Sequence, residues 1–175
     1  MIEVCIPSPL NTQYFTITDK GGSHKHQLQT NKLERLLIVD DGHVCRKMTV
    51  KRVNAQCDSI LEASNGLEAV NTVVELLSQG KILNGVLIDN SMPVMNGVEA
   101  TKLIREAGYR GKMIMITGNA LQADIQLALN AGIDAVYVKP LRKEEFISIL
   151  KGLINVLVQS YSLLIIVELN DRQAQ

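Results

Sequence analysis

Short apolar runs alternate with longer amphipathic segments from about Arg35 to about residue 152. Five of these runs are predicted strands: "RLLIVD" (35–40), "DSILEA" (58–63), "NGVLID" (84–89), "KMIMIT" (112–117) and "DAVYVK" (134–139). A helix is expected after each strand, over about 43–56, 66–79, 98–107 and 120–131 and from about 142. This alternation predicts an α/β fold, in which right-handed crossovers place helices on both faces of one parallel sheet.

Cap residues stand where the predicted helices should begin and end. Ser64 or Asn65 can cap the second helix, because a short polar side chain there accepts a hydrogen bond from a free helical N–H group. Gly80 is placed for the left-handed position after that helix, and Gly108 and Gly132 close the next two helices. These signals support the predicted helix boundaries.

The two ends of the chain do not follow this pattern. Residues 1–33 lack sustained periodicity and are predicted to be a flexible arm or linker before a domain at 34–152. Residues 153–175 are expected to hold the end of the last helix and an apolar tail. The run "GLINVLVQSYSLLIIV" is shorter and more interrupted than the roughly 20 apolar residues of a membrane span. Membrane contact is therefore not expected, and dimerisation through the last helix or tail stays open.

Composition narrows the class of protein. A length of 175 residues suits one domain with additional tails, and 46% apolar with 21% charged residues excludes a disordered chain. The 18 basic and 18 acidic side chains balance, so direct nucleic-acid binding is not expected. Three cysteines without metal-site spacing, and a start without signal-peptide character, favour a cytoplasmic, intracellular setting.

Polar residues follow the apolar strands. Asp40 and Asp41 come at the end of the first strand, Asp89 at the end of the third, Thr117 at the end of the fourth and Lys139 at the end of the fifth. The carboxyl ends of parallel strands share one edge of the sheet, which is where such folds bind ligands. We therefore expect three carboxylates, one hydroxyl and one ammonium group to meet there.

Three carboxylates at one edge repel one another, and a hard divalent cation would offset that repulsion. Mg²⁺ takes oxygen ligands from carboxylates, water and phosphate. With Asp41 and Asp89 on the ion, Lys139 and Thr117 would be free to contact a phosphoryl group. Because a carboxylate can act as a nucleophile, the site could form an aspartyl phosphate.

Four motifs support the interpretation as a phosphoryl-transfer site. They are "LLIVDDG", "LIDNSMPVMNGVEATKLIR", "MITGNA" and "YVKPL", in this order over about 34–150. Together they resemble the receiver domain of two-component response regulators, in the style of hybrid histidine kinases. The resemblance implies a flavodoxin-like, doubly wound (βα)5 fold with strand order 2-1-3-4-5. It also implies phosphoryl transfer from a histidine kinase or a histidine phosphotransfer protein, with catalysis limited to the chain's own phosphorylation and dephosphorylation.

The matched positions carry the roles that the resemblance implies. These are the phosphoacceptor (Asp89), a direct Mg²⁺ ligand (Asp41), a water-mediated contributor to the same ion (Asp40), a backbone carbonyl ligand (Ser91), the switch hydroxyl (Thr117) and the phosphate-pairing lysine (Lys139). The peptide between Lys139 and Pro140 is expected to be cis. Such a chain would be a stand-alone receiver or the terminal part of a hybrid kinase.

Some positions depart from the family pattern or allow another interpretation. Val136 stands where an aromatic switch residue is common, and Tyr137, one position later, should point to the opposite face. The basic residues of the first helix, Arg46, Lys47, Lys51 and Arg52, are either a solvated face or a docking surface. An aspartyl-nucleophile phosphatase is the alternative function. It is disfavoured because Ser91 occupies the position of the general acid.

Overall fold

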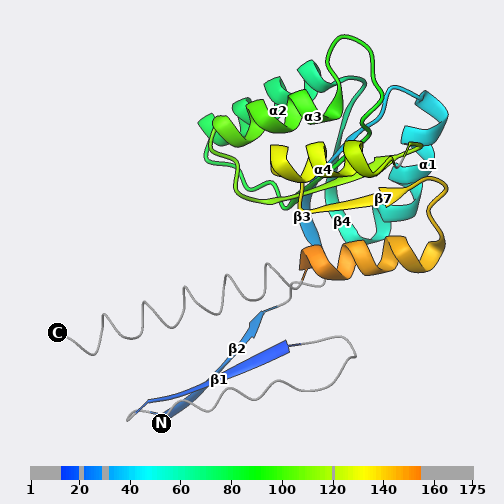
Figure 1. Cartoon of the computed structure of the whole chain (residues 1–175). Coiled ribbons are helices and arrows are strands. Elements are labelled where there is room, and N and C mark those ends of the chain that lie inside the picture. Colours follow the sequence, from blue (N-terminus) through cyan, green and yellow to red (C-terminus); the bar gives the residue numbers. More distant parts are fainter. Residues whose placement is uncertain (1–12, 20–21, 29–31, 120, 155–175) are drawn as a thin grey trace. The chain divides into compact units, whose positions relative to one another are not determined.

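The structure is a computed structural model that describes residues 13–19, 22–28, 32–119 and 121–154 (Figure 1). The chain forms two compact units, Met1–Asn31 and Lys32–Gln175. The second unit carries the predicted strand and helix alternation, and it holds all the candidate site residues.

The second unit is built on five parallel strands. They are β3 (Leu33–Val39), β4 (Cys57–Ala63), β5 (Gly85–Ile88), β6 (Lys112–Thr117) and β7 (Ala135–Val138). Their order across the sheet is β4-β3-β5-β6-β7. Counted from β3, this is the order 2-1-3-4-5, so the predicted flavodoxin-like fold class is confirmed.

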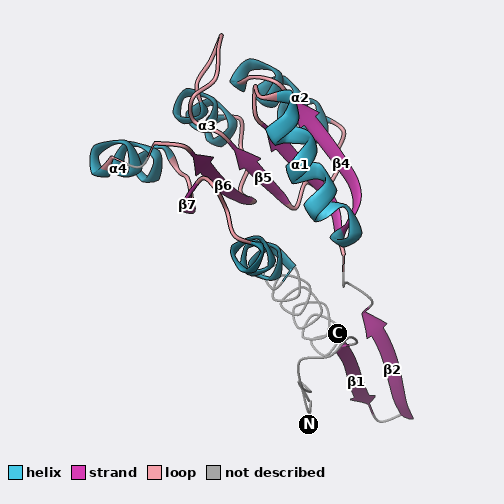
Figure 2. Ribbon diagram, turned by 90° about the vertical axis from the view of Figure 1, so that its right-hand side faces the viewer, coloured by secondary structure: helices cyan, strands magenta, loops and turns pink. Residues whose placement is uncertain are grey.

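Helices cover both faces of this sheet (Figure 2). They are α1 (His43–Val53), α2 (Gly66–Ser78), α3 (Gly97–Glu106), α4 (Gln122–Ala131) and a helix over residues 143–154. The predicted helix at 43–56 consists of α1 followed by a 3-10 turn, η1 (Asn54–Gln56). Residues of α2, α3 and α4 pack into one apolar cluster, and residues of α1 and of the helix at 143–154 pack into another.

The central strand β3 contributes to both clusters. Leu37 and Val39 lie in the cluster under α2, α3 and α4, whereas Leu36 and Ile38 lie in the other one. Successive side chains of a strand point to opposite faces, and a central strand of a covered sheet is buried on both of them. This explains why the run "LLIV" (36–39) is continuously apolar rather than alternating.

The predicted cap residues of α2, α3 and α4 are confirmed. The Asn65 side chain accepts a hydrogen bond from the Glu68 backbone N–H at 2.9 Å and so caps α2. Positive φ angles of 63°, 98° and 105° at Gly80, Gly108 and Gly132 follow the ends of α2, α3 and α4. Glycine adopts these left-handed conformations without the steric cost of a β-carbon.

The first unit lies within residues 1–33, which are predicted from the sequence to be a flexible arm or linker. It contains two antiparallel strands, β1 (Gln13–Asp19) and β2 (Gly22–Leu28), paired from Gln13↔Leu28 to Asp19↔Gly22. The missed signal is the β-branched and aromatic composition of "QYFTITD", which favours a strand. Its role as a linker stays a prediction.

The apolar tail expected over 153–175 lies outside the described residues from position 155 onward. In the described ranges, every helix is too short or too polar to cross a membrane. Dimerisation through the tail therefore stays a prediction.

Candidate functional site

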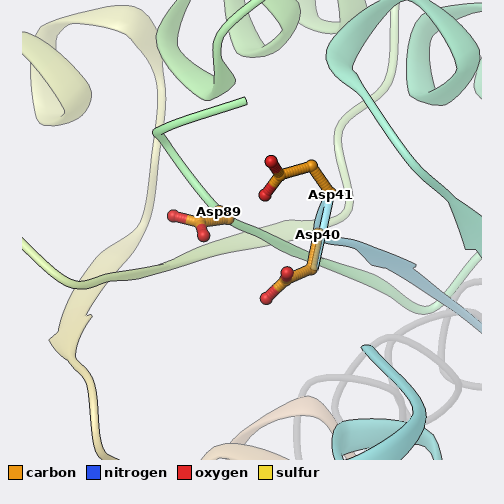
Figure 3. Close-up of side chains that lie close together, drawn as sticks. All are labelled: Asp40, Asp41 and Asp89. Carbon is orange, nitrogen blue, oxygen red and sulfur yellow. The ribbon is translucent and has the colours of Figure 1, made fainter. Parts of the chain in front are cut away.

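Three carboxylates converge at the carboxyl ends of two neighbouring strands (Figure 3). Asp40 and Asp41 follow β3 and Asp89 follows β5, and each offers a carboxylate oxygen within 4.8 Å of those of the other two. β3 and β5 are hydrogen-bonded neighbours in the sheet. The predicted meeting of these acids is therefore explained by strand order.

Backbone hydrogen bonds fix two of the acids to the sheet. The Asp89 N–H donates to the Val39 carbonyl at 2.8 Å, and the Asp40 N–H donates to the Ala63 carbonyl at 3.2 Å. These bonds lie one residue beyond the ends of β5 and β3, so they extend the strand pairing into the loops. The acids consequently stand on a rigid scaffold rather than on loose turns.

Lys139, the residue after β7, joins two of the acids. Its Nζ lies 2.7 Å from Asp40 Oδ2 and 2.5 Å from Asp89 Oδ2. Its own N–H donates to the Thr117 carbonyl at 2.8 Å, and its peptide bond to Pro140 is cis. Burial alone would lower the pKa of Lys139, but the hydrogen bonds and charges of Asp40 and Asp89 outweigh burial and raise it.

The three acids differ in exposure and in partners. Asp40 and Asp89 are only 7% and 8% exposed, whereas Asp41 is exposed. Asp40 Oδ1 accepts a hydrogen bond from the Gly42 N–H at 2.9 Å. Within the described ranges, the Asp41 carboxylate has no hydrogen bond or ion pair. This donor set fits Mg²⁺, which prefers hard carboxylate oxygens and keeps part of its water shell.

The loop after Asp89 is shaped by close packing. A β-carbon on Gly97 would lie 2.3 Å from the Asp89 carbonyl oxygen, far inside van der Waals contact. The Ser91 N–H donates to Asp89 Oδ1 at 3.3 Å, and the Gly97 N–H donates to the Asn90 carbonyl at 3.0 Å. The missing side chain of Gly97 therefore lets α3 begin directly against Asp89.

Thr117 lies at the same edge of the sheet as the acids. It is 3% exposed at the end of β6, and its Oγ1 accepts a hydrogen bond from the Asn119 N–H at 3.2 Å. In the part of the chain that the structure describes, no hydrogen bond joins Thr117 to a carboxylate. The structure thus brings Asp40, Asp41, Asp89 and Lys139 together, and the roles of Thr117 and of the Ser91 carbonyl stay predictions.

Two consecutive residues of β7, Val136 and Tyr137, face opposite sides of the sheet. Val136 packs against the apolar cluster under α2, α3 and α4, and Tyr137 packs against the other cluster. The prediction that Tyr137 points away from the face of Val136 is confirmed. An aliphatic side chain therefore stands at the position of the expected aromatic switch residue.

Known proteins match this part of the chain. A family model of the response regulator receiver domain covers residues 36–151. The two-component response regulator ORR41 of Oryza sativa subsp. japonica is 35% identical over 116 residues, covering 65% of this chain and 89% of the rice protein. The osmosensing histidine protein kinase SLN1 of Saccharomyces cerevisiae is 30% identical over 118 residues, covering 66% of this chain and 10% of that kinase.

A solved structure matches as well. The receiver domain of a sensor histidine kinase from Pseudomonas aeruginosa PAO1, crystallised with a magnesium ion coordinated in its active site cleft, is 28% identical. Its TM-score is 0.61, and the match covers 70% of this chain and 98% of that one. The family match spans β3 to the helix at 143–154, and so includes all three acids and Lys139. The chain belongs to the response regulator receiver domain family of two-component and phosphorelay systems.

Proposed function

We propose that this chain accepts a phosphoryl group on Asp89 from a phosphohistidine protein. The observation that carries the proposal is the contact of Lys139 with both Asp40 and Asp89, beside a third carboxylate at the same sheet edge. In this arrangement a carboxylate oxygen of Asp89 lies next to an ammonium group, which would also reach the oxygens of an incoming phosphoryl group. The donor would be a histidine kinase or a histidine phosphotransfer protein.

In the transfer, a carboxylate oxygen of Asp89 attacks phosphorus, and a new P–O bond forms as the P–N bond to histidine breaks. The electron pair of the P–N bond stays on the imidazole nitrogen of the donor, which then takes up a proton. Lys139 keeps its ammonium directed at this region and can shift hydrogen bonds from Asp89 to the phosphoryl oxygens. Catalysis by the chain is limited to its own phosphorylation and dephosphorylation.

The acidic cluster fits a magnesium ion. Asp41 and Asp89 would bind it directly, Asp40 through water, and the Ser91 carbonyl would add a further ligand. When bound, the ion supplies positive charge against the phosphoryl oxygens, as Mg²⁺ does in phosphoryl transfer. The bacterial receiver domain with magnesium in its cleft supports this assignment by similarity.

Phosphorylation would then switch the conformation of the chain. A phosphoryl group adds negative charge and acceptor oxygens at Asp89, and the Thr117 hydroxyl on the adjacent β6 would turn toward them. Val136 occupies the position of the aromatic switch residue, so the paired rotation of a ring is not part of this proposal. A phosphatase function is disfavoured because Ser91, which donates its N–H to Asp89, has no carboxyl group to act as a general acid.

The test is intact-mass analysis of the chain with acetyl phosphate, with and without Mg²⁺. We expect one phosphoryl adduct that requires Mg²⁺, is lost in Asp89→Asn and is reduced in Asp41→Ala. Asp58→Asn, which changes an exposed acid on β4, is the matched control and should label normally. An adduct that persists in Asp89→Asn would place the acceptor on another residue. Beryllofluoride binding would separate a short phosphate lifetime from a site without this chemistry.

A further inference from the structure

Arg46 connects helix α1 to the acidic loop after β3. Its guanidinium donates from Nη1 to the backbone carbonyl of Asp40, and from Nε to Glu62 Oε2 at 3.2 Å. Glu62 lies on β4, where it pairs with Ile38 of β3. A single side chain therefore bridges α1, the end of β3 and the end of β4.

The contact with Arg46 completes the hydrogen bonding of Asp40. The other partners of Asp40 are the Ala63 carbonyl (3.2 Å), the Gly42 N–H (2.9 Å) and Lys139 Nζ (2.7 Å). The carbonyl that Arg46 holds belongs to the peptide group leading into Asp41. Because a peptide group is planar, fixing its oxygen fixes the direction in which the chain enters Asp41. Arg46 can therefore orient Asp41 without touching its side chain.

Helix stability does not explain an arginine at this place. The Arg46 N–H makes the first helical hydrogen bond of α1, to the Gly42 carbonyl at 2.8 Å. The first turn of α1 has no acidic residue, and a cation near a helix N-terminus meets the positive end of the helix dipole. The Arg46 side chain is also only 14% exposed, so Arg46 is not part of a solvated basic face.

We propose that Arg46 is a positioning residue of the acceptor site, which orients the Asp41 carboxylate toward Asp89 by holding the Asp40 carbonyl. Glu62 offsets the charge of the guanidinium, so the acidic cluster keeps its attraction for a divalent cation. The inference rests on the proposed function and deepens it, because it names a residue that sets the affinity of the acidic cluster for Mg²⁺.

The experiment is a calorimetric titration of the full chain with Mg²⁺ alone, without a phosphoryl donor. Lys47→Ala is the matched control: Lys47 binds Glu62 Oε1 at 2.7 Å, but no hydrogen bond joins it to Asp40 in the described ranges. Arg46→Ala should weaken Mg²⁺ binding about tenfold, as loss of groups that orient metal ligands does. Lys47→Ala should stay within about twofold of the wild type.

Arg46→Lys is the conservative variant, and it carries the comparison if circular dichroism shows that Arg46→Ala is unfolded. A lysine lacks the planar guanidinium that can donate to two acceptors at once. The Mg²⁺ affinity of Arg46→Lys should therefore lie between those of the wild type and Arg46→Ala. If Arg46→Lys is the only folded variant, its Mg²⁺ affinity should be lower than that of the wild type. The inference is overturned by unchanged Mg²⁺ affinity in the Arg46 variants, by an equal loss in Lys47→Ala, or by a wild-type chain that does not bind Mg²⁺. A wild-type chain that binds Mg²⁺ but accepts no phosphoryl group would refute the proposed function instead.

Discussion

The ammonium nitrogen of Lys139 lies 2.5 Å from Oδ2 of Asp89, and the two residues are 50 positions apart in the sequence. The same nitrogen is 2.7 Å from Asp40 Oδ2. One cation therefore separates two carboxylates that are nearly buried and would otherwise repel each other. The stability of this edge of the sheet should depend on that cation.

Replacement of Lys139 by alanine should destabilise the fold and make it more dependent on Mg²⁺. Loss of the charged hydrogen bonds to Asp40 and Asp89 is expected to lower the free energy of unfolding by about 1–3 kcal/mol without metal. Added Mg²⁺ should stabilise Lys139→Ala more than the wild type, because the ion takes over the neutralisation of the carboxylates. Urea unfolding with and without Mg²⁺ measures both effects, with Lys143→Ala as an exposed-lysine control. Equal Mg²⁺ stabilisation of both proteins would contradict this explanation.

A side chain at position 97 should disturb the Asp89 loop. The β-carbon of Gly97→Ala would lie 2.3 Å from the Asp89 carbonyl oxygen, so the start of α3 or the loop must move. We expect a loss of about 1–3 kcal/mol in stability, together with slower phosphorylation at Asp89. Gly118→Ala is the matched control, since a β-carbon there would meet no atom within 4 Å. Thermal unfolding and the acetyl phosphate assay would detect the difference, and equal behaviour of the two variants would argue against a steric role of Gly97.

Val94 is a candidate for stabilisation. It is 78% exposed and has a φ angle of 68°, a left-handed conformation that is strained for a β-branched residue. Asparagine tolerates this conformation, so Val94→Asn should raise the free energy of unfolding by about 0.5–1 kcal/mol. Val44→Asn makes the same change at an exposed residue in α1 and should bring no gain. Chemical denaturation of both variants tests the prediction, which fails if Val94→Asn is no more stable than the wild type.

Asp134 should make the stability depend on pH. Its carboxylate accepts hydrogen bonds from the Met113 N–H (2.8 Å), Arg105 Nη2 (2.9 Å) and Lys112 Nζ (2.7 Å). Burial alone would raise the pKa of Asp134, but these hydrogen bonds and the two positive charges outweigh burial and lower it. The stabilisation is therefore present above the unfolded pKa of about 3.9 and is lost as pH falls through the lower folded value.

Because solvent screens this exposed carboxylate, Asp134→Asn should cost about 0.5–1 kcal/mol near neutral pH, and the difference from wild type should shrink below about pH 4. Urea unfolding at a series of pH values measures this difference, with Asp58→Asn as an exposed-acid control on β4. A difference between wild type and Asp134→Asn that stays constant down to about pH 2 would show that the charge of Asp134 is not the cause.

Local patterns determined the elements of this protein and the order of its site residues. Continuous apolar runs predicted the five strands, and helix-capping signals at Asn65, Gly80, Gly108 and Gly132 placed the helix ends. Because parallel strands present their carboxyl ends at one edge, the positions of Asp40, Asp41, Asp89 and Lys139 along the chain were enough to predict that they meet. Each of these inferences depends only on near neighbours in the sequence and on the geometry of strands and helices.

Only the tertiary structure decided the exposure, the hydrogen-bond partners and the close contacts of those residues. In the structure, Asp40 and Asp89 are buried around Lys139, and Asp41 is exposed. Arg46, which the sequence places on a basic surface of the first helix, donates a hydrogen bond to the Asp40 carbonyl. The tertiary structure also requires Gly97 to be small, because α3 begins against the Asp89 carbonyl. The physical reason is that exposure, hydrogen-bond partners and close contacts arise between segments far apart in the chain, and no local pattern of residues encodes those distances.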